Sequence, residues 1–395
     1  MMRDIVLAGL IALVAIAWLV QRIDQRAPTA PGVSGTALLN AAPDAFKRVT
    51  GPEPLVFPAD HAMHPGYRNE WWYFTGNLFD RSGQRYGFQF TLFRFAVEPG
   101  PQLDSDFDSD AVWMAHLAVS DVAGERFISE ERFARGALGL AGATADEWWL
   151  RDWTVTRVED GWRLRAQLDV GMLELDLVPR KPVVLQGDSG YSQKGSAQGN
   201  ASRYYSMTRM GADGRLQLDG NTFEVSGLAW LDREWGSSQL GPGIAGWDWF
   251  ALQLDDGRDL MLYRLRTEDG GASRFSAGVL VESDGSYRIL GREDFEFSEI
   301  RRWKDRQGVS WPVAWRVRLP AEDLAFDVRP AFDAQRWYAT VGYWEGAVDV
   351  IDTVDGEDGR ILGRGYLELS GYADGGNEDS ENGSGRARDR RLSTR

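Results

Sequence analysis

Residues 86–92 read Tyr-Gly-Phe-Gln-Phe-Thr-Leu, and this stretch decides the fold. Its large apolar side chains recur at every second position and fall on one face, while Gln89 and Thr91 fall on the other. Residues 164–170 repeat the alternation, and turn signals that end in glycine separate such stretches. A period of two with hairpin turns predicts antiparallel β-sheet, of the kind found in sandwiches and closed barrels.

The chain contains two copies of this plan. A Trp-rich stretch, a turn and an alternating strand open each half, and later blocks also match. The matching pairs are 71–74 with 247–250, 115–119 with 277–281, 176–179 with 327–330, and 204–206 with 343–346. We therefore expect an all-β protein with two antiparallel barrels in tandem, at residues 57–225 and 226–374.

Composition excludes several classes of function. The chain has 395 residues, which suits two or three domains. Lys and Arg number 44 against 59 Asp and Glu, a net charge of −15, which argues against nucleic acid as a partner. The absence of cysteine excludes disulfides, thiolate metal sites and cysteine nucleophiles. No glycine-rich phosphate loop or Gly-x-Ser-x-Gly elbow is present, and we expect no cofactor.

The N-terminus reads as a membrane segment. Residues 5–20 are an unbroken apolar run, which is short for a spanning helix and suits a signal segment. No small residues follow the run as a cleavage site would require. We therefore expect residues 1–26 to be an uncleaved anchor in the inner membrane, with the body on the periplasmic face; a cleaved signal peptide and secretion are the alternative. Residues 27–56 read as a linker and residues 375–395 as a disordered tail.

The first stretch with candidate chemistry is residues 60–64, Asp-His-Ala-Met-His. His61 and His64 could ligate a metal with Asp60 or Glu70, but a loop His-x-x-His lacks the helical spacing of a metalloprotease motif. We therefore expect no metal here. Hydrogen bonds from the two histidines to the backbone would instead shape the mouth of a barrel.

The second stretch is Glu70, which precedes Trp71 and Trp72. A carboxyl group buried beside two indoles would have a raised pKa and could donate a proton. The alternative is a structural ion pair with Arg68 or Arg94.

The third stretch, residues 230–237 with 246–249, interleaves charged residues with four tryptophans. In a regular strand, Asp232 and Glu234 share one face, and Arg233 shares the other with a tryptophan. One face would carry acids and the other a cation on which aromatic rings can stack. The alternative is an internal ion pair between an arginine and an aspartate that stabilises the barrel.

These stretches together resemble the AttH-like family, which also contains the carotenoid 1,2-hydratases (hydroxyneurosporene synthases). The matching blocks are residues 57–61, 64–65, 69–76, 114–116, 205–209, 230–236 and 246–250, within about residues 55–372. The resemblance implies two lipocalin-like β-barrels in an exported protein, and such proteins often carry the label of a predicted secreted hydrolase. It also suggests an ABC-transporter permease as a partner.

The resemblance implies a chemistry as well. In a hydratase of this kind an acid protonates an alkene, a tertiary carbocation forms, and activated water adds to it. Indole faces stabilise the cation, and an apolar pocket keeps the acid protonated. The hydratase branch carries a His and an Asp where this chain has Arg233 and Leu265, and guanidinium does not titrate near neutrality. Only Trp235 and Tyr263 carry over from that branch.

We expect a protein that binds a hydrophobic molecule, a lipid or isoprenoid, in a barrel or between the barrels, and that hydrates, isomerises or hydrolyses it. A non-catalytic lipid carrier or assembly factor for a membrane transporter is the alternative, and solvent-facing carboxylates in an open groove would favour it. Carbohydrate binding would require exposed indoles. The candidate catalytic residues are Asp232, Glu234, Trp235, Tyr263 and Glu70, and the candidate ligand-binding residues are Trp71, Trp72, His61, His64, His116, Arg233, Trp247, Asp248 and Trp249.

Overall fold

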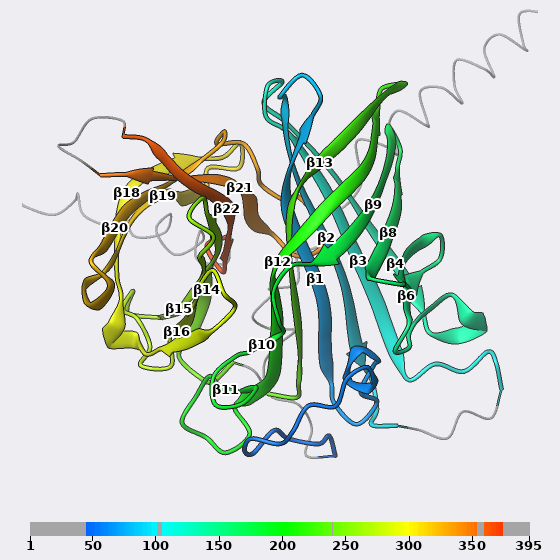
Figure 1. The fold of residues 1–395 in the computed structure, drawn as a ribbon. Helices are drawn as coiled ribbons and strands as arrows, with labels where there is room; N and C mark the ends of the chain where they lie inside the picture. Colours follow the sequence, from blue (N-terminus) through cyan, green and yellow to red (C-terminus); the bar gives the residue numbers. More distant parts are fainter. Residues whose placement is uncertain (1–44, 101–104, 239, 354–358, 374–395) are drawn as a thin grey trace, which may run out of the picture. The chain divides into compact units, whose positions relative to one another are not determined.

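The computed structural model describes residues 45–100, 105–238, 240–353 and 359–373, which form two antiparallel sheets (Figure 1). The expected all-β class is confirmed: the sheets are barrel-like, one a nearly closed barrel and one a half-barrel. The expected anchor at residues 1–26 and tail at 375–395 lie outside the described residues. Within the described part, no helix has the length and apolar character needed to span a bilayer.

The first sheet has 13 strands, in the spatial order β4-β3-β2-β1-β13-β12-β9-β8-β7-β6-β5, with β10 and β11 also paired to β12. The strands are β1 (Asn69–Asp80), β2 (Arg85–Ala96), β3 (Ala111–Asp121), β4 (Arg126–Arg135), β5 (Ala141–Ala143), β6 (Glu147–Leu150), β7 (Trp153–Val158), β8 (Gly161–Leu168), β9 (Gly171–Pro179), β10 (Val184–Leu185), β11 (Tyr191–Gln193), β12 (Ala201–Leu218) and β13 (Asn221–Gly236). The expected boundary at 225/226 falls inside β13, so the first sheet extends to Gly236.

The second sheet has nine strands, in the order β17-β16-β15-β14-β22-β21-β20-β19-β18. The strands are β14 (Ile244–Leu254), β15 (Asp259–Thr267), β16 (Ala277–Val281), β17 (Tyr287–Leu290), β18 (Glu296–Lys304), β19 (Ser310–Leu319), β20 (Leu324–Pro330), β21 (Tyr343–Asp352) and β22 (Ile361–Ser370). The described helices are short 3₁₀ turns: η1 (Ala59–His61), η2 (Ala137–Gly139), η3 (Arg292–Asp294) and η4 (Pro320–Glu322).

The two sheets share one plan. Four strands joined by hairpins, β1 to β4 and β14 to β17, are followed in space by the last strands of each half, β13 and β22. On the first sheet Asp232 of β13 pairs with Ser206 of β12, and on the second Glu368 of β22 pairs with Glu345 of β21. Asp232 also faces β1 as Glu368 faces β14. Asp232 and Glu368 therefore occupy equivalent positions.

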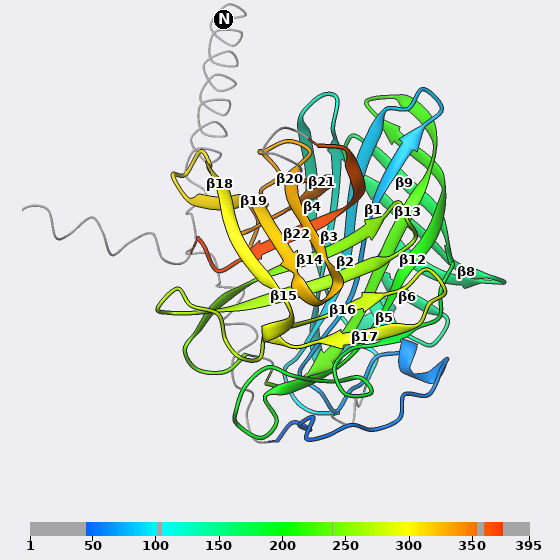
Figure 2. The same ribbon diagram turned by 60° about the vertical axis from the view of Figure 1, so that its left-hand side comes forward.

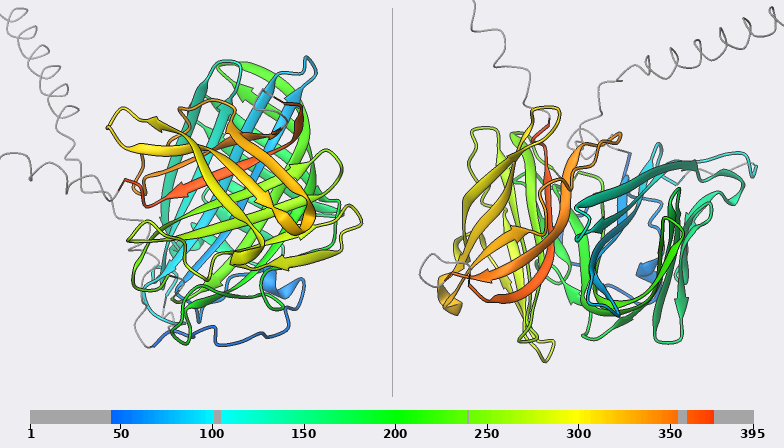
Figure 3. Two further views of the ribbon diagram at one scale, coloured as in Figure 1. Left: turned by 90° about the vertical axis from the view of Figure 1, so that its left-hand side faces the viewer. Right: turned by 90° about the horizontal axis from the view of Figure 1, so that it is seen from above.

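Each sheet curls around its own apolar core (Figure 3). Alternation along the strands turns one face of each sheet inward, and that face carries large aromatic side chains. Trp72, Trp113 and Trp148 are fully buried in the first core, and Trp311 and Trp315 in the second. Aromatic side chains of this size dominate the free energy gained by burial.

The opposite faces of the two sheets pack against each other, which we call the seam. Strands of the second sheet cross those of the first there (Figure 2). Tyr73 of the first sheet and Trp249 of the second share one apolar cluster. Arg85 adds an ion pair across the seam, with Nη1 2.6 Å from an Asp349 carboxylate oxygen. The seam is therefore a second buried layer between the two cores.

The last residues of the expected linker pack against the first sheet. Phe46 and Val49 are buried. The Lys47 N–H donates to the Gly66 carbonyl at 2.9 Å, and the Ser237 hydroxyl donates to the Lys47 carbonyl at 2.5 Å. The described part of residues 27–56 is thus held by the first sheet.

Gly87 of β2 tests how closely the seam is packed. A Cβ at this position would lie 2.8 Å from the Ala347 Cβ and 2.8 Å from the Tyr366 hydroxyl oxygen, both on the second sheet. We expect Gly87→Ala to lower the free energy of unfolding by about 1–3 kcal/mol in urea titrations, because the two sheets must move apart. Gly51→Ala is the control, since no atom lies within 4 Å of its added Cβ. Equal stability of the two variants would contradict close packing at the seam.

Candidate functional site

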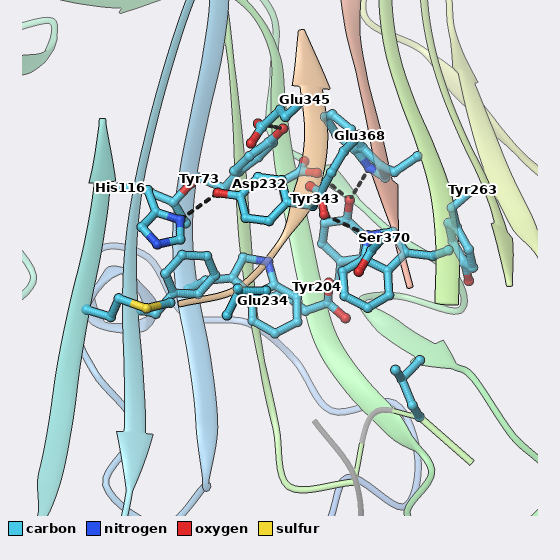
Figure 4. Close-up of a pocket in the computed structure, with 18 of the residues that line it drawn as sticks. Tyr73, His116, Tyr204, Asp232, Glu234, Tyr263, Tyr343, Glu345, Glu368 and Ser370 are labelled. Atoms are coloured by element: carbon cyan, nitrogen blue, oxygen red, sulfur yellow. Dashed lines mark hydrogen bonds between the residues drawn. The ribbon is translucent and has the colours of Figure 1, made fainter. Parts of the chain in front are cut away.

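A cavity of about 140 Å³ lies at the seam, on the sheet faces opposite the two cores (Figure 4). A cavity of similar volume in another protein holds one benzene molecule, so this space accepts one ring or a short branched group. Its lining is mainly aromatic and aliphatic, and four carboxyl groups and one ammonium group point into this apolar surrounding. A longer ligand would extend beyond the cavity.

Asp232 on β13 is one of the four carboxyl groups. Its Oδ1 accepts hydrogen bonds from the Ser206 hydroxyl at 2.5 Å and from the Trp230 indole N–H at 2.7 Å. The Tyr204 hydroxyl donates to Oδ2. Burial raises the pKa of Asp232 to about 7, although these three donors act to lower it. The carboxyl group therefore exchanges a proton near neutral pH.

Glu368 is the equivalent carboxyl group on β22. Its Oε1 accepts a hydrogen bond from the Trp247 indole N–H at 2.8 Å. Burial raises the pKa of Glu368 to about 7, against the effect of that donor. The two equivalent positions thus hold two carboxyl groups that titrate in the same pH range.

Glu345 on β21 differs from both. The Tyr73 hydroxyl donates to its Oε1, while its Oε2 is buried and has no hydrogen-bond partner. Burial and the nearby charge of Glu368 raise the pKa of Glu345 well above its ordinary value, although Tyr73 and Tyr343 act to lower it. Burial therefore favours the neutral carboxylic acid form of Glu345, and such a group can donate a proton.

Lys194 and Glu234 form an ion pair in the cavity wall. Nζ of Lys194 lies 2.8 Å from Oε1 of Glu234, which also accepts from the Ser202 hydroxyl. The ammonium group lies 5.2 Å from the ring centre of Tyr204 and 4.8 Å from that of Tyr263. Burial acts to lower the pKa of Lys194, but Glu234, Tyr263 and Asp232 together raise it above its ordinary value, so the lysine stays charged.

A chain of three groups leads from the protein surface to the cavity. The Glu131 side chain is 16% exposed, and its Oε2 lies 2.9 Å from Nε2 of His116. Nδ1 of the same ring lies 2.5 Å from the Tyr343 hydroxyl, which lines the cavity. Burial lowers the pKa of His116, and Glu131 offsets part of this effect. A carboxylate that orients an imidazole toward a hydroxyl is an arrangement able to move protons.

The structure divides the sequence-predicted residues between the two faces of the sheets. The residues that line the cavity are Asp232, Glu234, Tyr263, Trp71, His116, Trp247 and Trp249. Those that lie outside its lining are Glu70, Trp235, Trp72, His61, His64, Arg233 and Asp248. Alternation along β13 explains the division, because Asp232 and Glu234 point to the seam while Arg233 points to the first core.

Glu70 lies in a buried ionic cluster away from the cavity. Its carboxylate oxygens lie 3.2 Å from Nη1 of Arg94 and 2.6 Å from Nη2 of Arg233. Burial acts to raise the pKa of Glu70. The combined effect of Arg233, His64 and Arg94 is larger and lowers the pKa to about 2. The expectation of a raised pKa and a proton donor at Glu70 is wrong, because two guanidinium groups stabilise the carboxylate. Arg233 also departs from the Arg–Asp pair offered as the alternative for its stretch, because its partner is Glu70.

The two histidines of the N-terminal loop have separate roles in the same region. The His64 ring stacks on Trp235 with 3.9 Å between ring centres, and Arg233 lies 4.8 Å from that indole. Nδ1 of His61 lies 2.6 Å from the Tyr205 hydroxyl. Among the residues that the structure describes, no group of three or more His, Asp or Glu side chains is arranged to hold a metal ion.

Asp248 holds the second barrel together. It is fully buried, with one oxygen 2.6 Å from Nε of Arg264 and the other accepting from the Tyr372 hydroxyl at 2.8 Å. These partners satisfy the Asp248 carboxylate, so no ligand is needed to compensate its charge.

Sequence reasoning missed several lining residues: Tyr73, Lys194, Tyr204, Tyr343, Glu345 and Glu368. The match of residues 204–206 with 343–346 contained the signal, since it aligns Tyr204 with Tyr343 and Ser206 with Glu345. Lys194 follows β11 in a loop, where no repeat or alternation marks it.

Comparison with known proteins places this site in context. A family model described as AttH-like matches residues 48–372. A solved AttH of Nitrosomonas europaea is 35% identical, covering 83% of this chain and 100% of its own, with a TM-score of 0.74. Kievitone hydratase of Nectria haematococca is 12% identical, covering 82% of this chain and 98% of its own, with a TM-score of 0.59, which shows a shared fold. None of the curated proteins matches the chain.

The buried cluster around Glu70 yields a stability test. We expect Glu70→Gln to lower the free energy of unfolding by about 3–5 kcal/mol at neutral pH, because it leaves the buried guanidinium group of Arg233 without its carboxylate and leaves Arg94 with Asp110 alone. The folded pKa of about 2 lies below the ordinary value of 4.5. The wild type therefore holds this stabilisation above about pH 4.5 and loses it as the pH falls toward 2, whereas the variant shows no such loss from this group.

Urea unfolding at several pH values measures both effects. Glu147→Gln, which neutralises an exposed carboxylate, is the matched control and should unfold like the wild type. An equally stable Glu70→Gln variant would show that the cluster contributes little.

Proposed function

The chain belongs to the AttH-like family, and from this premise we propose that it is an enzyme that binds a hydrophobic molecule in the seam cavity and adds water to one of its carbon–carbon double bonds. The observation that carries the proposal is Glu345, a carboxyl group buried among aromatic side chains, whose pKa burial raises well above its ordinary value. Kievitone hydratase, which shares the fold, is a hydratase by name, and this supports the choice of reaction.

The proposed reaction begins with proton transfer. Glu345 gives its carboxyl proton to one alkene carbon, and the positive charge forms on the other. The faces of the tryptophan and tyrosine rings stabilise that carbocation, since they carry negative charge density and cannot add to it as water does. Water then forms the new carbon–oxygen bond and passes one proton to a base. The product is an alcohol, and Glu345 is left as a carboxylate.

Asp232 is the proposed base. Its pKa of about 7 is suited to accepting a proton at neutral pH, and Glu368 shares this property. Glu345 must be protonated again before the next cycle. The chain from Glu131 through His116 to Tyr343 supplies a route for protons to the cavity while a hydrophobic ligand excludes water.

The carrier remains the alternative, as a protein that delivers a lipid to a transporter. Carboxylates that face solvent in an open groove would favour it. Asp232 and Glu234 are 3% and 4% exposed and lie among aromatic side chains, which favours the enzyme.

The location of the protein is part of the proposal. We propose that residues 1–26 tether it to the inner membrane with the barrels on the periplasmic face, where an ABC-transporter permease would be a neighbour. Support comes from the apolar run at residues 5–20 alone. The protein should stay with membranes after an alkaline wash, and a chain that begins at residue 27 should not.

Substitution of the acids tests the reaction. We expect Glu345→Gln to lower kcat by about 10²–10⁴-fold, because the amide cannot supply the proton. Asp232→Asn and Glu234→Gln should also abolish turnover while the fold is kept. The assay offers acyclic isoprenoid alkenes in isotope-labelled water and detects the labelled alcohol by mass spectrometry. Glu147→Gln serves as the control with wild-type activity. Full turnover in Glu345→Gln would remove this residue from the mechanism, and no labelled alcohol from any alkene would refute hydration of this class.

The same assay gives a pH dependence. A base must be ionised, so kcat should rise as the pH rises through about 7, the pKa of Asp232, and then level off. A rate that falls over this interval would contradict the role of Asp232.

A further inference from the structure

The cavity carries an excess of acidic groups over basic ones. Among its described lining residues, Asp232, Glu234, Glu345 and Glu368 face a single ammonium group, that of Lys194. The lysine is already paired with Glu234 at 2.8 Å. Asp232, Glu345 and Glu368 are therefore left without a cationic partner in the cavity. Ionisation of Asp232 or Glu368 in this buried place is costly unless a ligand compensates the charge.

One of these acids has an unused oxygen. Glu345 is 1% exposed, and its Oε2 has no hydrogen-bond partner although it is buried. Buried polar atoms are almost always paired in folded proteins. An unpaired carboxyl oxygen in the wall of a cavity is thus an indication that a bound molecule supplies the partner.

Aromatic rings from both sheets surround the acids. Trp71 and Tyr73 come from β1, and Trp247 and Trp249 come from β14. The face of an aromatic ring attracts a cation, and cages of such rings recognise quaternary ammonium groups. Carboxyl groups set among these faces add direct charge complementarity.

We propose that the cavity binds a hydrophobic cation, such as an alkylammonium group attached to one apolar ring. The proposal rests on the proposed function in one respect, because the same cavity groups would stabilise a carbocation there. It also goes beyond it, since a stable ammonium compound would bind without reacting.

An isosteric pair of compounds tests the proposal on the full-length protein. Benzyltrimethylammonium and neopentylbenzene have the same shape and differ by one nitrogen for carbon, and so by one positive charge. We expect the ammonium compound to bind at least about tenfold more tightly, as judged from the change in tryptophan fluorescence. Both compounds carry one ring, as the cavity volume requires.

Variants separate charge from shape. Asp232→Asn and Glu368→Gln should each weaken the binding of benzyltrimethylammonium about tenfold and leave that of neopentylbenzene unchanged. Glu147→Gln, at an exposed position of β6, should change neither. If one of the two cavity variants does not fold, the other still tests the role of charge, because Asp232 and Glu368 occupy equivalent positions.

Proton release gives an independent reading. A bound cation lowers the pKa of Asp232 and Glu368 from about 7, so protons should be released at neutral pH, and affinity should rise as the pH rises through 7. Calorimetry in buffers of different ionisation enthalpy counts these protons. The other titratable groups that face the two carboxyl groups are Glu234, Glu345, Lys194, His116, Tyr73, Tyr204, Tyr263 and Tyr343.

The outcomes are distinct from those of the hydration assay. Equal affinity for the two compounds, or equal losses of both in the variants, would overturn the inference. Ammonium preference without hydration of any alkene would refute only the proposed reaction, and hydration without ammonium preference would refute only this inference.

Discussion

The alternation of side chains along β13 is the constraint on which the site depends. Because successive residues of a strand point to opposite faces, Asp232 and Glu234 are carried to the seam while Arg233 is carried to the first core. On the core side the guanidinium group finds a carboxylate, Glu70, and forms a permanent ion pair. On the seam side burial raises the pKa of Asp232 to about 7, although its hydroxyl and indole donors act to lower it. The strand β13 thus places a cation that stabilises the fold on one face and the cavity acids on the other.

The internal repeat explains why the cavity lies at the seam. Two sheets of one plan turn the same face toward each other, so equivalent positions meet across a common space. Asp232 and Glu368 are such a pair, and both are buried among aromatic rings. The position opposite Asp232 on its sheet is a serine, Ser206, whereas the position opposite Glu368 is a carboxylic acid, Glu345. This single difference gives the cavity a carboxyl group whose pKa burial raises well above its ordinary value.

The sequence was sufficient for the fold class and for part of the site. Period-two alternation and hairpin glycines predicted two antiparallel β-barrels, and the cavity lies between them, one of the two places expected for a ligand. Asp232, Glu234 and the tryptophans around residue 248 could be found because charge is interleaved with indole there. Glu70 has the same local pattern but differs in its surroundings, since Arg94 and Arg233 reach it from neighbouring strands. The sequence offered Arg94 as an alternative partner of Glu70, but its spacing did not show that Arg233 also reaches this carboxylate, and Glu345 was missed for the same reason.

The protonation state of Glu345 tests the account most directly. Infrared difference spectra of the wild type against Glu345→Gln, recorded at neutral pH, distinguish a carboxylic acid from a carboxylate by the carbonyl stretching band. The account predicts a band of a protonated carboxyl group that disappears in the variant. A difference spectrum that contains only carboxylate bands would contradict it, because a charged Glu345 could not donate a proton into the cavity.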